Sequence, residues 1–126
     1  MYHKNPQYVL TVKVACKICI TLQCKTQDLN AEKPNYFTLN IMLMRNHGKK
    51  IELATTDRLH ASSGDYRTGF VVLTLNRLPP NKYTLIVSTF NPQEFGNYLL
   101  SIKYKAIDPK FNQHPYDAPI VLLRDL

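Results

Sequence analysis

The chain has 126 residues and a mass of 14.6 kDa, the size of one ordinary domain. Hydrophobic residues make up 44% and charged residues 20%, which excludes a disordered segment. No apolar stretch approaches the roughly 18–20 residues of a membrane-spanning helix, and no secretory signal is visible behind Met1. We therefore expect one soluble globular domain over residues 1–126.

The charge is basic and unevenly distributed. Sixteen Lys and Arg against nine Asp and Glu give a net charge of +7. Residues 1–50 carry eight basic and two acidic residues (+6), and residues 51–126 carry eight and seven (+1). A basic half favours an acidic protein segment, an anionic membrane or nucleic acid as partner, without choosing among them. The odd number of cysteines, three, favours reduced thiols in the cytoplasm.

Apolar and polar residues alternate with period two along most of the chain, which is typical of half-buried strands. The pattern is clearest in residues 17–25, where Ile18, Ile20 and Leu22 occupy every second position. A register slip of one residue would bury the polar set, so this strand is well specified. The strands expected in chain order are 8–14, 17–25, 37–44, a short one at 51–54, 69–76, 83–89, 97–105 and a terminal apolar strand at 120–124.

Residues that favour turns separate these segments. Glycine, proline, asparagine and serine gather at residues 46–48, 62–65, 79–81 and 91–97. Residues 106–119 contain two prolines and predict an irregular crossing segment, and only weak helical patterns occur, at 28–33 and 58–62. Seven to eight short strands joined by turns predict an all-β fold, an antiparallel β-sandwich.

The sequence predicts no metal site, no cofactor and no catalysis. Cys16 and Cys19 would point to opposite faces of a strand and lack a second ligand pair, which argues against zinc. Cys16 and Cys24 share the apolar parity and are expected in the core. Asp57 and Asp65 flank one loop, where solvated turns are favoured over a calcium site. No cysteine and histidine form a recognisable nucleophilic pair.

Two groups of basic residues form the candidate site. Three occupy outward positions of the first two expected strands, and three surround the turn at residues 46–48. They are Lys13, Lys17 and Lys25, and Arg45, Lys49 and Lys50. If the two strands are neighbours, one sheet face is rich in lysine, while the alternative is ordinary solubilising decoration. Most aromatic residues share the parity of the core instead of alternating with these charges, so no nucleic-acid binding is expected.

One part of the sequence resembles a known family. Residues 83–92 read Tyr-Thr-Leu-Ile-Val-Ser-Thr-Phe-Asn-Pro, preceded by the turn at 79–81, and residues 98–102 read Tyr-Leu-Leu-Ser-Ile. This arrangement resembles the C2-like β-sandwich domains of calpains, over about residues 7–105. Within that family it is most similar to the C-terminal domain of the fungal calpain-like cysteine proteases of the alkaline-pH response, the PalB type.

The resemblance implies a C2-like sandwich that is not itself an enzyme, because the nucleophile motif Gln-x-x-x-Asp-Cys-Trp is absent and the chain has no Trp. The acidic loop of animal calpain sandwiches is also missing, which argues against calcium. The implied role is to recruit or position the parent protease through an acidic protein partner, an ESCRT-III subunit, at endosomal membranes. The rest of the parent protease is a further implied partner. An anionic-lipid-binding domain and a structural brace for the protease core stay open as alternatives.

Overall fold

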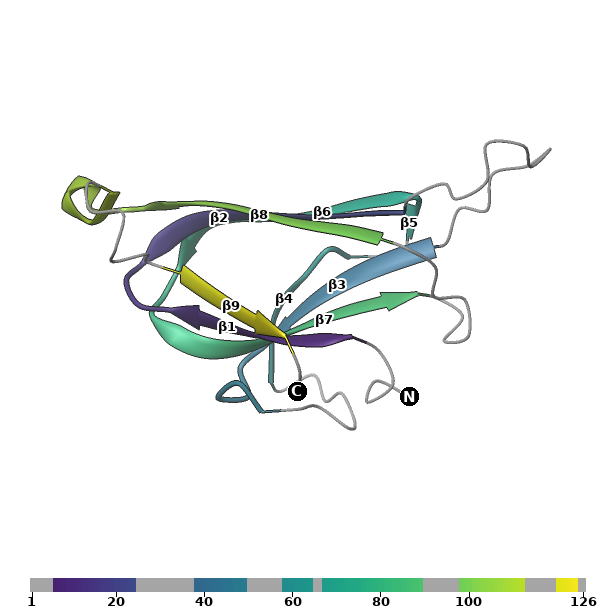
Figure 1. Cartoon of the computed structure of the whole chain (residues 1–126), viewed down its shortest axis with the longest axis horizontal. Helices are drawn as coiled ribbons and strands as arrows, with labels where there is room; N and C mark the ends of the chain where they lie inside the picture. Colours follow the sequence, from purple (N-terminus) through teal and green to yellow (C-terminus); the bar gives the residue numbers. More distant parts are fainter. Residues whose placement is uncertain are drawn as a thin grey trace.

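Two antiparallel sheets pack face to face in the computed structural model of the chain, sheet B above and sheet A below in Figure 1. The structure describes residues 6–24, 38–49, 58–64, 67–89, 98–112 and 120–124. Within these residues it holds nine strands and one short 3-10 helix, which confirms the predicted all-β sandwich. None of the described residues forms a helix of the length and apolar character needed to cross a bilayer.

Sheet A is built around β7, which pairs with β3 on one side and with β1 on the other. The strand order is β4-β3-β7-β1-β9, and β5 also pairs with β3. The bounds are β1 (Gln7–Val12), β3 (Thr38–Met44), β4 (Leu59–Ser62), β5 (Arg67–Thr68), β7 (Asn81–Thr89) and β9 (Ile120–Arg124).

Sheet B has three strands in the order β6-β2-β8, so that β2 is paired along both of its edges. Its strands are β2 (Cys16–Cys24), β6 (Phe70–Leu78) and β8 (Tyr98–Ala106). The 3-10 helix η3 (Pro109–Asn112) follows β8 at the end of the sandwich, on the left in Figure 1.

The core lies between the two sheets and follows the predicted alternation. Ile18, Ile20 and Leu22 of β2 are at most 1% exposed, while the residues between them point away from the core. Burying a side chain of this kind contributes about 1.5–3 kcal/mol relative to leaving it in water. From sheet A the facing residues include Leu10, Ile41 and Leu85.

The two cysteines at the start of β2 point to opposite faces, as the sequence predicted. Cys16 is buried, its thiol donates a hydrogen bond to the Val14 carbonyl at 3.1 Å, and burial raises its pKa. Cys19 lies on the outer face and is partly exposed. The side chain of Cys24, also expected in the core, lies outside the described residues.

The outer face of sheet A is also covered where β7 crosses it. Ile86 and Thr84 on this face are fully buried, although they alternate with the core residues of the same strand. The Thr84 hydroxyl donates a hydrogen bond to the Lys49 carbonyl at 2.6 Å, which ties the segment after β3 to the sheet. Burial on both faces explains why β7 reads as a nearly continuous apolar run.

Two local predictions were wrong. Of residues 58–62, expected as a weak helical pattern, Leu59–Ser62 form β4 instead. Ala61 pairs with Leu43 of β3, and sheet pairing overrides local propensity. The first strand ends at Val12 rather than at residue 14, because a bend at residues 13–14 leads the chain from sheet A to sheet B. The expected strand at 51–54 and the helical pattern at 28–33 lie outside the described residues.

Gly48 tests how closely the segment after β3 packs on sheet A. Its φ is +73°, and a Cβ built there would lie 2.9 Å from Val9 Cγ1. We expect Gly48→Ala to lower the free energy of unfolding by more than the about 1–2 kcal/mol of a left-handed residue, because the valine is stiff at χ1. Urea denaturation followed by circular dichroism measures the change.

Gly64→Ala is the matched control. Gly64 has a similar φ of +86°, but nothing lies within 4 Å of its added Cβ, so this variant should lose only the backbone contribution. Equal losses in the two variants would contradict the close approach of Gly48 to Val9.

Candidate functional site

Of the six basic residues singled out from the sequence, the four that the structure describes do not share one sheet face. A lysine-rich sheet face would require the first two strands to be neighbours, but β1 lies in sheet A and β2 in sheet B. Lys13 is exposed in the bend between them, and Lys17 is exposed on β2. Arg45 and Lys49 are exposed in the segment after β3, near sheet A. Residues 25 and 50 lie outside the described residues, and the binding role of the whole set stays a prediction.

Lys17 belongs to a different cluster on the outer face of sheet B. In the register of β2 and β8, Lys17 lies directly opposite Lys105, and Cys19 lies directly opposite Lys103. Side chains opposite each other in an antiparallel pair have Cβ atoms about 4.5–5.5 Å apart. Lys17 and Lys105 are therefore direct neighbours, and Lys103 lies one row farther along the same open face. We call Lys17, Lys103 and Lys105 the basic cluster.

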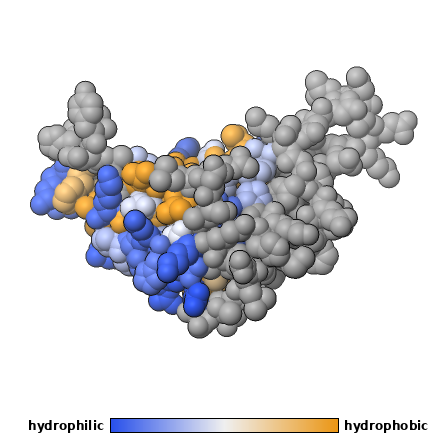
Figure 2. Space-filling model, turned by 60° about the horizontal axis from the view of Figure 1, so that its bottom comes forward, coloured by the Kyte–Doolittle hydropathy of each residue, from blue (hydrophilic) through white to orange (hydrophobic). Residues whose placement is uncertain are grey.

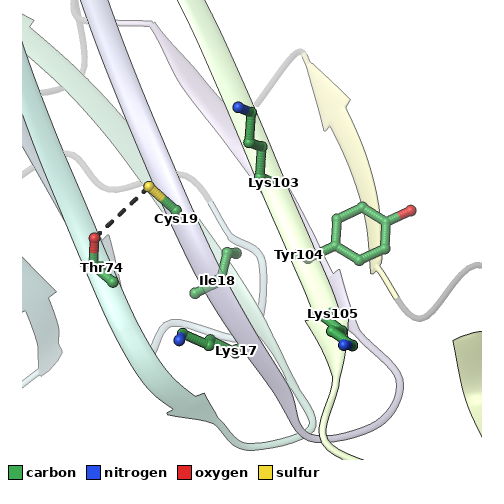
Figure 3. A pocket seen from close by; sticks show the side chains of 7 residues that line it. All are labelled: Lys17, Ile18, Cys19, Thr74, Lys103, Tyr104 and Lys105. Carbon is green, nitrogen blue, oxygen red and sulfur yellow. Dashed lines mark hydrogen bonds between the residues drawn. The ribbon is translucent and has the colours of Figure 1, made fainter. Parts of the chain in front are cut away.

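A shallow pocket of about 230 Å³ lies within this cluster. Its lining comes from all three strands of sheet B, and Thr74 of β6 donates a hydrogen bond from its hydroxyl to the Cys19 sulfur at 3.7 Å. Figure 3 shows the Tyr104 ring turned away from Cys19, on the other side of β8. The lining residues are Lys17, Ile18, Cys19, Thr74, Lys103, Tyr104 and Lys105.

The basic cluster has no counter-charge in the part of the chain that the structure describes. Asp108 is the single acidic residue there, and its carboxylate pairs with Lys110 at 3.7 Å. Like charges placed directly opposite each other destabilise a sheet. The positive charges of Lys17 and Lys105 therefore repel each other in the folded chain. A bound anionic group would reduce this repulsion.

The chemistry of the basic cluster is that of anion binding. Lysine ammonium groups can donate hydrogen bonds to carboxylate or phosphate oxygens, whereas the single hydroxyl proton of Thr74 is directed at the Cys19 sulfur. Among the described residues, no group of His, Cys, Asp and Glu could hold a metal ion. Asp57 and Asp65, weighed from the sequence as a calcium pair, lie outside them.

Sequence reasoning missed Lys103 and Lys105. Their alternation was visible within the expected strand 97–105, and both stand on its polar side. What the sequence did not contain was the pairing of β8 with β2, because the two strands come from opposite ends of the chain. Their proximity is a consequence of sheet order.

A second basic region lies near the outer face of sheet A, around the segment after β3. It comprises Arg45, Lys49 and Lys82, all exposed. Asn46 fixes this segment, since it accepts a hydrogen bond from Arg58 Nη1 at 2.7 Å and donates one from its Nδ2 to the Lys49 carbonyl at 3.1 Å. Figure 2 brings this underside of the molecule forward and shows hydrophilic side chains gathered beside apolar ones.

Arg45 also acts on two aromatic groups at the end of sheet A. The His60 and Tyr83 rings lie 5.3 Å apart, and the Tyr83 hydroxyl donates a hydrogen bond to the Pro79 carbonyl at 2.8 Å. Burial lowers the pKa of His60, and the positive charge of Arg45 lowers it further. Burial raises the pKa of Tyr83, and Arg45 opposes that rise. We therefore interpret the contact between His60 and Tyr83 as part of the packing of sheet A and not as a reactive site.

The chain is similar to one family of known proteins. Residues 1–103 match the family model of the calpain large subunit, domain III. The calpain-like protease palB of Emericella nidulans is 31% identical over 99 residues, which cover 79% of this chain and 11% of that protein. The calpain-like protease palB/RIM13 of Aspergillus oryzae is 27% identical over the same shares. A palB/RIM13 protein of Cryptococcus neoformans is 33% identical over 67 residues, 53% of this chain and 8% of that protein. The chain thus matches about a tenth of the length of these relatives.

The repulsion within the basic cluster can be measured through stability. Lys17→Gln should raise the free energy of unfolding at low ionic strength by about 0.2–1 kcal/mol, because it removes a like charge opposite Lys105. The gain should shrink when salt screens the charges. Lys110→Gln is the matched control, since Lys110 has a carboxylate partner and should give no gain. A less stable Lys17→Gln variant would contradict the geometry.

The environment of His60 predicts a pH dependence. Its pKa is lower in the folded chain than the usual 6.5, so the unfolded chain binds more protons as the pH falls below that value. The free energy of unfolding should therefore fall with decreasing pH in this range, and less steeply in His60→Gln. His47→Gln, at an exposed position, is the control. Identical slopes in urea titrations of the wild type and His60→Gln would argue against the effect.

Proposed function

The chain belongs to the family of domain III of the calpain large subunit, a non-catalytic domain, and on that premise we propose that it recruits or positions a protease through protein–protein binding. The parent is a calpain-like cysteine protease of the fungal alkaline-pH response. The partner is an acidic protein of the ESCRT-III type, and the site of action is the cytoplasmic surface of endosomal membranes. The relatives named as calpain-like proteases support the parent enzyme.

One observation carries this proposal: the basic cluster on the outer face of sheet B. Its three lysines lie on neighbouring strands, open to solvent, with Lys17 directly opposite Lys105. None of them has a carboxylate partner among the described residues, where Asp108 already pairs with Lys110. An acidic partner supplies the missing charge.

The mechanism is electrostatic capture followed by local enrichment. Complementary charge speeds the encounter of two proteins and fixes their relative orientation more than it raises affinity. Once the domain is bound, the remainder of the same polypeptide is held near its substrate at a raised effective concentration. The sandwich contributes a rigid face, because β2 is hydrogen-bonded along both edges and its apolar side is in the core.

Two sets of charge reversals, matched in number and size, test this function. The first changes Lys17, Lys103 and Lys105 to Glu, and the second changes Arg45, Lys49 and Lys82 to Glu in the second basic region. Capture of purified ESCRT-III subunits by the immobilised chain should occur at low ionic strength and weaken at high ionic strength. It should be lost in the first set and retained in the second, with folding checked by circular dichroism.

The same experiment separates the alternatives. Capture that survives the first set, or that is lost only in the second, contradicts the basic cluster as the binding site. Binding to anionic vesicles in place of the protein would move the domain to the lipid-binding class, where each nearby basic residue contributes about 1 kcal/mol. If the chain captures no protein and binds no anionic vesicles, the recruitment proposal is contradicted and the structural brace for the protease core becomes the favoured role.

A further inference from the structure

The outer face of sheet B changes from apolar to basic along its length. Where the strand pairing is regular, the outward side chains of this face form rows that run across β6, β2 and β8. Each row contains one outward side chain from each strand. At the basic end lie Lys17 with Lys105 and, one row on, Cys19 with Lys103. The next two rows centre on Thr21 and Gln23. Their outer members are Val72 and Ser101, and Phe70 and Leu99, respectively.

The far end of this face exposes large apolar side chains. Phe70, Val72 and Leu99 are 49%, 41% and 46% exposed, and they stand in two adjacent rows. Scattered apolar residues on a surface are ordinary, but a cluster of them marks an interaction site. A hollow of about 240 Å³ lies at the β6 edge of this end, lined by Ser63, Phe70, Val71 and Val72. Phe70 is an exception to the prediction that most aromatic residues share the core parity.

The dimensions of the face match one helix. From the row of Gln23 to that of Lys17 the strand advances about 20 Å at roughly 3.4 Å per residue, and three strands are about 10 Å wide. A helix with its side chains is about 10–12 Å across, and about 13 residues of helix span about 20 Å. The backbone of β2 is already hydrogen-bonded along both edges, to β6 and to β8. A partner that lies across this face therefore meets side chains, and an added strand would find no free backbone N–H or C=O groups of β2.

We propose that the outer face of sheet B docks an amphipathic helix of an acidic protein partner, with apolar side chains over the Phe70–Leu99 end and carboxylates over the basic cluster. This inference rests on the proposed function and specifies the partner segment. The carboxyl end of the helix lies over the lysines, where the negative end of the dipole and the carboxylates both meet positive charge, and the lysines offset the repulsion between those carboxylates and the dipole. In the partner's sequence the apolar residues therefore precede the acidic ones.

A designed peptide tests the inference. It has about 15 residues, with leucines on one face of its first half and glutamates on the same face of its second half. Fluorescence anisotropy of the labelled peptide measures affinity for the full chain. A second readout is alkylation of Cys19, which lies within the face and should be protected when the peptide is bound. The control peptide has the same composition in reversed order.

Three variants of the chain define the docking face. Phe70→Ser with Leu99→Ser should weaken binding of the peptide about tenfold or more, and so should the charge reversal of the basic cluster. Ile107→Ser with Phe111→Ser, at exposed apolar residues near η3, should leave the affinity unchanged. The reversed peptide should bind about tenfold more weakly than the original, and Cys19 protection should follow affinity in every case.

The outcomes distinguish this inference from the function it rests on. If the charge reversal abolishes capture of the acidic protein but the serine variant binds protein and peptide normally, the helix docking is wrong and recruitment through the lysines stands. If neither variant changes binding, both are wrong. Equal affinity for the reversed peptide overturns the orientation. Binding of the chain to phosphatidylserine vesicles but not to the peptide overturns docking of a protein helix.

Discussion

The register of β2 is the constraint from which both the core and the candidate site follow. Because side chains alternate along a strand, the register that buries Ile18, Ile20 and Leu22 also sets the intervening residues on the outer face. Pairing with β8 then brings Lys17 opposite Lys105. A shift of one residue would bury the lysine and expose the isoleucines, so the hydrophobic core enforces a charge arrangement that is unfavourable by itself.

The two sheets differ in what covers their outer faces. On sheet A, the segment after β3 lies over β7 and is held there by the hydrogen bond from the Thr84 hydroxyl to the Lys49 carbonyl. Ile86, which points to the same outer face of β7, is buried. On sheet B, the outward side chains of β6 and β8 include Val72 and Leu99, both substantially exposed. The outer face of sheet B therefore carries exposed apolar and basic groups, and the proposed recruitment uses this face.

Sequence patterns predicted the fold well and the site only in part. Period-two alternation gave the strands of the core, and the resemblance around residues 83–92 led to the calpain family that the comparisons confirm. The weak helical pattern at 58–62 misled because strand pairing to β3 decided its conformation. Lys17 was singled out, but its neighbours Lys103 and Lys105 were not, since sheet order is set by contacts between distant parts of the chain. Outward parity identifies which lysines are exposed, and topology decides which of them meet.

The most direct measurement is a residue-resolved NMR titration of the isotopically labelled chain with an ESCRT-III subunit. The account predicts that the amide shifts change along the outer face of sheet B, around Lys17, Cys19 and Lys103, and that these changes weaken as salt is added. The amide chemical shifts of Lys49 and Lys82 in the second basic region should not change. Changes confined to that second region, or no changes at concentrations where the subunit is captured, would contradict it.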